Sequence, residues 1–176
     1  VPFIFLTLIA LGYIVGKCLK KQPMISGSGI PQVEGILTRN LKINWFSVLM
    51  YKFVGGLICL CAGLSVGREG PSVQMGACIG EGVSKNLKNL DNEEKYLITS
   101  GASAGLSAAF NAPLSGVMFA LEEAHKNFSP LVLTSAMIAS ISADFVSKQF
   151  FGLIPSLDFR KVESLPLKNY WTLIIL

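Results

Sequence analysis

The chain has 176 residues, of which 51% are hydrophobic and 15% are charged, and its formal net charge is +4. A soluble domain carries about 25% charged residues, so this composition argues against a soluble protein and predicts one embedded in a lipid bilayer. The basic residues are too few and too scattered for nucleic-acid binding. We therefore expect a single transmembrane domain over residues 1–176, with an all-α fold and no soluble domain.

Apolar runs along the chain predict the membrane helices, and several are close to the ~20 residues that cross a bilayer. A soluble helical core is the alternative, but it would need charged outer helix faces, and one run carries no charge at all. We expect a multi-pass integral membrane protein, in the plasma or inner membrane. The runs are 1–16, 43–66, the charge-free 97–121, and 127–143, and a fifth starts at Tyr170.

Basic residues at the ends of the first apolar runs predict the orientation of these helices. Cytoplasmic ends of membrane helices carry an excess of lysine and arginine. Run 1–16 lacks the basic start and small-residue cleavage site of a signal peptide, so we do not interpret it as one. The residues that mark the expected cytoplasmic ends are Lys17, Lys20, Lys21, Arg39 and Lys42.

Three short breaks in the apolar sequence predict helix starts at membrane depth. They are Ser-Gly-Ser-Gly-Ile-Pro at 26–31, Gly-Arg-Glu-Gly-Pro at 67–71 and Asn-Ala-Pro at 111–113. In each, a proline follows small or capping residues, which suits the first turn of a helix but not its interior. Broken helices are tolerated in a membrane only where they line a cavity or are buried in protein. Secondary transporters use such helix starts to bind anionic substrates.

The first two breaks predict an anion site made of backbone amides. A helix N-terminus carries about half a positive charge and unpaired N–H donors, so it binds an anion without a formal cation. Ser28 adds a hydroxyl donor, although it could equally be a simple helix cap. The residues expected to contact the anion are Ser28, Gly29, Ile30, Arg68, Glu69 and Gly70.

Glu69 is an acid between two apolar stretches, where insertion costs roughly 2.5–3.5 kcal/mol, and such a residue predicts a functional site. When ionised it competes for the place of the anion, and when protonated it can move away. This competition would couple proton binding to anion binding. The alternative is an ion pair with Arg68, but adjacent side chains on a starting helix point in different directions.

Two acids, Glu122 and Glu123, follow the charge-free run 97–121. They could simply mark the water-facing end of a helix. Adjacent positions lie on different faces, so we expect one acid toward solvent and the other toward the protein interior. Glu122 and His125 match half of a di-iron Glu-x-x-His motif, but the chain has one histidine, so we expect no metal.

Other residues predict how the helices pack. Lys52 is the one charge in run 43–66 and needs a partner or a watery cavity; an acid partner and a role as positive potential near the anion path both stay open. The cysteines are best interpreted as small buried thiols. Residues 152–169 are expected to form a long exposed loop. Four Gly-x-x-x-Gly pairs predict close helix contacts: Gly12/Gly16, Gly63/Gly67, Gly76/Gly80 and Gly101/Gly105.

Taken together, these motifs resemble the CLC family of chloride channels and proton/chloride transporters. The resemblance covers essentially the whole chain and rests on three signatures in order, at 27–31, at 67–76 and at 105–123. It implies a homodimer with one anion pathway per subunit, each subunit being built from two inverted halves of short, tilted helices. This chain resembles the first half. The Gly-x-Phe-x-Pro loop and the tyrosine of the second half do not occur in it, so a second half is an expected partner.

The resemblance also implies roles for individual residues. Ser28 matches the serine that contacts the central anion and favours chloride over nitrate or fluoride. The amides of Arg68, Glu69 and Gly70 match those that hold the external anion, and Glu69 matches the gating glutamate. Glu123 matches the inner proton-transfer glutamate of exchangers, which favours proton-coupled exchange over a passive pore.

The leading prediction is therefore chloride transport coupled to protons, with chloride as the transported ligand and no cofactor. A gated passive chloride channel of the same family is the near alternative. A membrane scaffold that transports nothing, or an inactive isolated half, is the alternative from another class. We expect no enzyme activity, because the lone His125 lies among charged residues rather than beside a serine in an apolar run.

Overall fold

The computed structural model describes residues 2–87, 91–126 and 129–152, and these ranges form helices without a strand. Helices satisfy their own backbone hydrogen bonds, which lipid cannot do, and the predicted all-α fold is confirmed. In chain order the elements are α1 (Pro2–Lys21), the 3-10 helix η1 (Pro23–Ile25), α2 (Ile30–Leu37), α3 (Trp45–Cys61), α4 (Glu69–Leu87), α5 (Asp91–Phe110), α6 (Pro113–Phe119), the π-helix η2 (Ala120–His125) and α7 (Pro130–Phe151).

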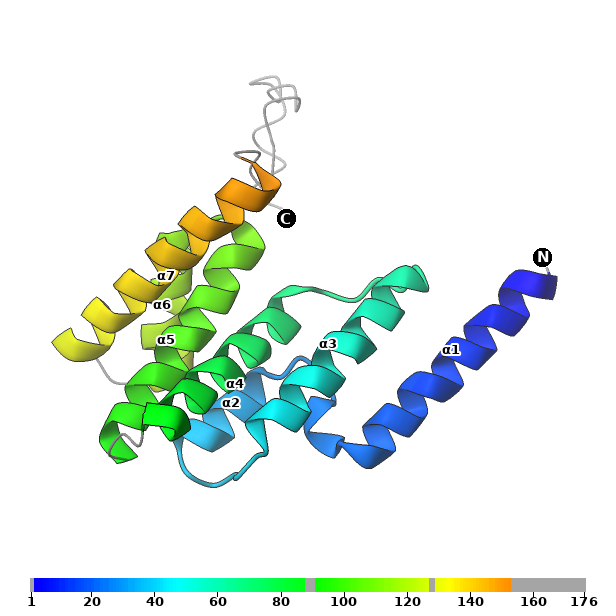
Figure 1. Ribbon diagram of the computed structural model, residues 1–176, viewed down its shortest axis with the longest axis horizontal. Helices are drawn as coiled ribbons and strands as arrows, with labels where there is room; N and C mark the ends of the chain where they lie inside the picture. The colour runs from blue at the N-terminus through cyan, green and yellow to red at the C-terminus, as the bar shows by residue number, and fades with distance from the viewer. Residues whose placement is uncertain (1, 88–90, 127–128, 153–176) are drawn as a thin grey trace, which may run out of the picture.

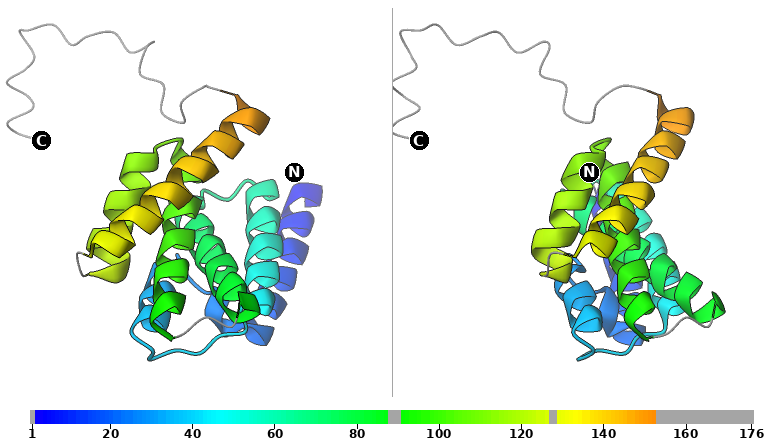
Figure 2. Two further views of the ribbon diagram at one scale, coloured as in Figure 1. Left: turned by 60° about the vertical axis from the view of Figure 1, so that its left-hand side comes forward. Right: turned by 90° about the vertical axis from the view of Figure 1, so that its left-hand side faces the viewer.

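The helices form a bundle in which α4 and α5 are central (Figure 1). Helix α4 packs on α5, and α7 crosses α5 and α6 on the other side (Figure 2). Helix α1 lies at the edge of the bundle and contacts α3 and η1. The short helix α2 packs against α4, α5 and η2. This arrangement places the loop before α2 next to the start of α4, with Gly29 buried and Ser26, Gly27 and Ser28 exposed.

Glycines bring α4 and α5 into backbone contact. A Cβ atom built on Gly76 would lie 2.9 Å from the carbonyl carbon of Gly101, and one on Gly101 would lie 2.9 Å from the carbonyl carbon of Gly76. Gly80 and Gly105 face backbone atoms of the other helix in the same way. Two of the four predicted glycine pairs therefore mediate close helix contact. A Cβ on Gly12, in contrast, would have no neighbour within 4 Å.

Buried serines join α5 to α7. The hydroxyls of Ser103 and Ser140 lie 2.5 Å apart, and the Ser107 hydroxyl donates to the Ser140 carbonyl at 2.9 Å. All three residues are fully buried. Hydrogen bonds of this kind between membrane helices contribute about 0.6 kcal/mol on average. The pairing explains why α5 can be rich in small polar residues and still pack in the interior.

An apolar cluster fixes the position of α2. Val33 and Leu37 of α2 pack with Val73 of α4 and Ile98 of α5, and all four are buried. Because α2 has only eight residues, it is too short to be stable alone and depends on this packing. The cluster therefore determines where the N-terminus of α2 lies.

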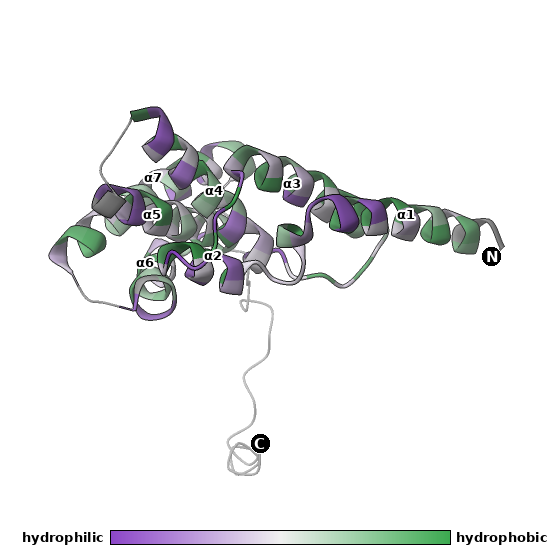
Figure 3. Cartoon of the chain, turned by 90° about the horizontal axis from the view of Figure 1, so that it is seen from below, coloured by the Kyte–Doolittle hydropathy of each residue, from purple (hydrophilic) through white to green (hydrophobic). Residues whose placement is uncertain are grey.

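The outer surface of the bundle suits a lipid environment. Within the described ranges, α7 is the one helix long and apolar enough to cross a membrane, and Trp45–Cys61 is apolar but shorter. Large apolar side chains on α1, α3 and α7 point outward. Hydrophilic residues gather around α2 and at the end of α1 when the molecule is viewed from below (Figure 3). The end of α1 and the loop after α2, where the predicted cytoplasmic residues lie, share this lower side in Figure 1.

The predicted helix starts are confirmed by the element bounds. Pro31 lies in the first turn of α2, Pro71 in the first turn of α4, and Pro113 begins α6. The last break divides the apolar run 97–121 between α5 and α6. The run from Tyr170 and nearly all of the expected loop 152–169 lie outside the described residues.

The prediction of buried thiols is right for Cys78 and wrong for Cys61, which is exposed at the end of α3. Cys18 and Cys59 are half-buried. The sequence could not reveal this difference, because α3 is apolar on most of its surface and only its packing decides which face is covered.

We expect Gly101→Ala to destabilise the protein by about 1–3 kcal/mol, because the new methyl group would overlap the α4 backbone, which cannot yield as a side chain can. The control is Gly12→Ala, in open space on α1, which should be neutral or stabilising by up to about 1 kcal/mol. Unfolding of the full-length protein that contains this chain, measured in detergent micelles, checks both. Equal stability of the two variants would contradict the close contact.

Candidate functional site

The loop before α2 presents a serine and a left-handed glycine at the helix start. Gly29 has φ 98° and is buried, and Pro31 lies in the first turn. The Ile30 N–H donates to the Ser28 hydroxyl oxygen at 3.4 Å, which is long for a hydrogen bond. Ser28 is therefore a weak cap at most. Its own hydroxyl proton can still be donated to another group.

Helix α4 starts with the acid that the sequence singles out. Glu69 is its first residue and is half-buried, while Gly70 is buried. The Glu69 carboxylate turns back toward Gly67, in the space that a side chain at Gly67 would need. A carboxylate at this end is stabilised by the helix dipole. Arg68 and Glu69 form no ion pair with each other in the part of the chain that the structure describes.

The two helix starts meet in space. A Cβ atom on Gly70 would lie 2.9 Å from both the carbonyl carbon and the Cβ atom of Ser28. Only glycine permits so close an approach, which explains a glycine directly after Glu69. The structure thus brings the Ser28 loop to the residue next to Glu69, although some 40 residues separate the two segments.

Lys52 of α3 and Gln74 of α4 donate hydrogen bonds to the backbone that leads into α2. The Lys52 ammonium donates to the carbonyls of Ile25 at 2.9 Å and Gly27 at 2.8 Å. The Gln74 amide donates to the carbonyl of Met24 at 2.8 Å. The partners of Lys52 are therefore backbone carbonyls of η1 and of the loop, and not an acid. Because these carbonyl oxygens are engaged by donors, their negative ends are not free to repel an anion at the helix start.

Sequence reasoning did not single out Gln74. It is 1% exposed, and its side chain packs directly on Gly29. The available signal was a long polar side chain in the uncharged stretch 70–80. Such a residue inside a membrane protein needs a hydrogen-bonding partner. The sequence alone does not show that the partner is the Met24 carbonyl of η1, 50 residues away.

The two acids that follow α6 lie in the π-helix η2. Both Glu122 and Glu123 are exposed, and both line a cavity of about 640 Å³ together with Ile30 of α2. The expectation that one of them faces the protein interior is wrong. A π-helix widens the turn, and such segments are frequent at functional sites. Ile30 joins this cavity to the Ser28 loop, and the remaining lining residues are Leu114, Ser115, Met118 and Phe119.

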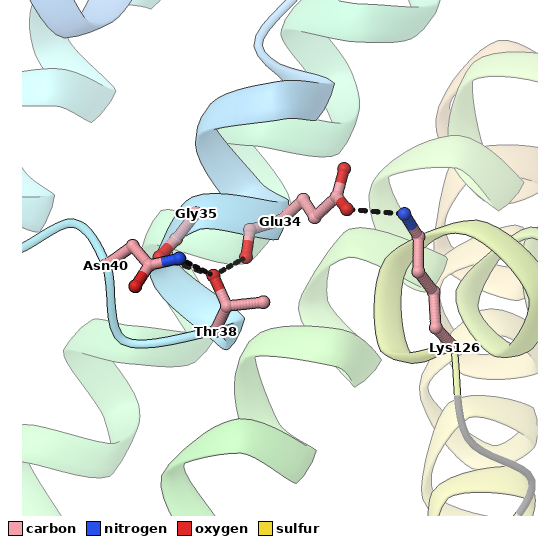
Figure 4. Close-up of polar contacts among 5 residues, drawn as sticks. All are labelled: Glu34, Gly35, Thr38, Asn40 and Lys126. Carbon is pink, nitrogen blue, oxygen red and sulfur yellow. Dashed lines mark hydrogen bonds and ion pairs between the residues drawn. The ribbon is translucent and has the colours of Figure 1, made fainter.

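Lys126 follows η2 and makes an ion pair with Glu34 of α2 (Figure 4). The hydrogen bond that Lys126 donates to Glu34, the charge of Glu34 and the charge of Glu123 together raise the pKa of Lys126 above its usual value. The ion pair thus joins the residue that follows η2 to α2.

Two further hollows lie on the α4 side of the bundle, and Arg68 lines both. One, of about 330 Å³, is mainly apolar and lies among α1, α3 and α4, with Lys52 in its wall. The other, of about 980 Å³, lies among α4, α5 and α7. Arg68 is itself exposed. Arg68 therefore borders both hollows directly before the start of α4.

Comparison with known proteins identifies the relatives of this arrangement. A family model described as "Voltage gated chloride channel" matches residues 8–176. The chain belongs to this family. It is 38% identical to the H(+)/Cl(-) exchange transporter ClcA of Citrobacter koseri and 37% identical to ClcA of Salmonella newport. Each alignment covers 99% of this chain and 37% of the relative, so the chain spans about a third of the length of these curated relatives.

A solved structure has the same fold. The crystal structure of a slow cyanobacterial Cl-/H+ antiporter matches 98% of this chain with a TM-score of 0.83 and 36% sequence identity. The match covers 42% of that protein. The predicted membership of the CLC family and the predicted all-α membrane fold, corresponding to part of the CLC architecture, are confirmed.

We expect Gly29→Ala to disturb the start of α2, because its Cβ would lie 2.5 Å from Oε1 and 2.7 Å from Cβ of the buried Gln74. Gly27→Ala is a control, since Gly27 also has a positive φ, of 67°, but has no neighbour within 4 Å. Amide hydrogen exchange in α2 should accelerate strongly in the first variant and much less in the second. Similar exchange in both would show that Gln74 does not fix the loop.

Proposed function

We propose that this chain provides the first half of the anion pathway of a proton-coupled chloride exchanger. Chloride and protons are the transported species, no cofactor takes part, and the protein carries out no chemical conversion. The remainder of the anion site comes from a second half like that of the family, and the functional unit is a homodimer in the plasma or inner membrane. The exchanger names of the relatives support this proposal.

The observation that carries the proposal is the position of the Ser28 loop between two acids. On one side, the loop contacts Gly70, the neighbour of Glu69. On the other side, Ile30 lines the cavity that also holds Glu123. An anion at the amides of Gly29 and Ile30 would thus lie between an acid at the start of α4 and an acid within η2. This order is what an exchange of anions for protons requires.

The electrostatics of the site favour binding that remains reversible. The helix starts offer N–H donors with a partial positive charge. The full positive charge of Lys52 is separated from the helix start, because its ammonium donates to the carbonyls of Ile25 and Gly27. Lys52 adds positive potential without contacting the anion directly. A halide can therefore be attracted and still be released.

Glu69 is the proposed gate. Its ionised carboxylate is attracted to the same helix start as the anion, so the two exclude each other. Protonation removes that attraction and frees the place for chloride. Each exchange of carboxylate for chloride then requires a proton to bind or leave at Glu69, which couples the two movements.

Glu123 is the proposed inner proton-transfer site. Its charge acts on Lys126 and it lines the cavity that reaches Ile30. A proton that crosses the apolar interior toward Glu69 needs a titratable group at the inner end of its path. A passive channel would not need this acid, and this difference separates the exchanger from the gated-channel alternative.

Glu69→Gln should abolish proton coupling and leave chloride movement intact, because the amide cannot take up or release a proton. The measurement is chloride flux and chloride-driven proton uptake by the full-length protein in liposomes. Glu93→Gln, at an exposed acid in the first turn of α5, is the control and should keep coupling. Coupled proton uptake in the Glu69 variant would exclude Glu69 as the gate.

Glu123→Val should also uncouple protons while leaving the anion path open, and Glu122→Val should have a much smaller effect. Both acids are exposed in the same cavity, so the two variants form a matched pair. The readout is the proton-to-chloride ratio in liposomes. Intact coupling in Glu123→Val would place the inner proton site elsewhere. A reversal potential of the parent protein that ignores pH would favour the passive channel.

A further inference from the structure

The ion pair between Glu34 and Lys126 connects the two parts of the proposed pathway. Glu34 lies in α2, the helix that begins at the Ser28 loop, and Lys126 lies directly after η2, three residues beyond Glu123. The two residues are 92 positions apart in sequence. The contact therefore joins the anion-binding helix to the segment that carries the inner acid (Figure 4).

The α2 end of this contact is firmly held. The Thr38 hydroxyl donates to the carbonyls of Glu34 at 3.0 Å and Gly35 at 3.2 Å, and the Asn40 amide donates to the Thr38 hydroxyl at 3.1 Å (Figure 4). The backbone amides of Asn40 and Leu41 also donate to the Gly35 carbonyl. These bonds close the C-terminus of α2, as its unpaired carbonyls require. A short helix closed in this way moves as one body, so Glu34 and Ile30 shift together.

The other end of the contact is held in an unusual backbone conformation. Lys126 ends η2 with φ 55°, in the left-handed region that residues with a Cβ adopt at a cost of about 1–2 kcal/mol. Such a conformation persists only where its surroundings over-determine it. The ion pair with Glu34 is one such constraint. It links the turn that follows Glu123 to α2.

The ion pair is too exposed to be a major source of stability. The Lys126 side chain is 51% exposed and that of Glu34 is 38% exposed. Exposed ion pairs contribute little to folding because solvent screens them. The charge of Glu123 nevertheless acts on Lys126, which is already balanced by Glu34. Loss of Glu34 would leave Lys126 free to pair with Glu123 instead.

We propose that Glu34 and Lys126 are positioning residues for proton transfer: their ion pair holds Glu123 free of a direct cation partner and in register with the start of α2. This inference rests on the proposed function, because it assigns Glu123 the inner proton-transfer role. Neither residue contacts the anion site itself. Their loss is expected to impair proton coupling far more than chloride movement or stability.

The test uses the full-length protein in liposomes with two neutral variants, Glu34→Gln and Lys126→Asn. Asparagine tolerates the left-handed backbone, so the second change removes the charge and not the turn. Proton uptake per chloride should fall about tenfold in each, because small displacements of a reacting group are costly. Lys42→Met, which removes an exposed charge between α2 and α3, is the control and should keep the parent ratio.

Exchange of the two charges separates positioning from other roles. The double variant Glu34→Lys with Lys126→Glu should recover most of the coupling that the single variants lose, and Lys126→Arg should retain it. Thermal unfolding midpoints should stay close to the parent in all variants. Full coupling in both neutral variants, or no recovery in the charge exchange, would overturn the inference. Full coupling in Glu123→Val would instead overturn the proposed function, so the two failures are distinguishable.

Discussion

A backbone segment that leaves helical geometry inside a membrane needs hydrogen-bonding partners from the protein, because lipid offers none. In this chain Lys52 of α3 and Gln74 of α4 supply them: they bind the carbonyls of Met24 and Ile25 in η1 and of Gly27 in the loop before α2. Both side chains are buried. Two helices thus determine the position of one loop, and the start of α2, its contact with Gly70 and the cavity beyond Ile30 depend on that position.

Helix α4 carries much of this arrangement on its successive turns. Its first residue is Glu69, Gly70 then admits the Ser28 loop, and Gln74 binds the loop one turn later. Gly76 and Gly80 bring the remainder of the helix against the backbone of α5. The site therefore depends on the close contact between α4 and α5. A shift of α4 along α5 would move Glu69, Gly70 and Gln74 together.

Much of the architecture could be predicted from the sequence because proline and glycine act locally. The three breaks became the starts of α2, α4 and α6, and the resemblance of the motifs to the CLC family is confirmed. Predictions that depended on which helix face is covered were less successful. Glu122 and Glu123 both open to one cavity, and Cys61 is exposed. Helical periodicity gives the angle between two side chains, but neighbouring elements decide which of them is buried.

The sequence by itself determined where helices begin, which acids lie in apolar surroundings and to which family the motifs point. These features depend only on residues that are close in the sequence, so the sequence pattern is enough to predict them. Only the tertiary structure decided that Lys52 binds loop carbonyls, that Gln74 supports Gly29 and that Lys126 pairs with Glu34. Each of these contacts joins residues far apart in the chain. Their partners are selected by how whole helices pack, and no local pattern encodes that choice.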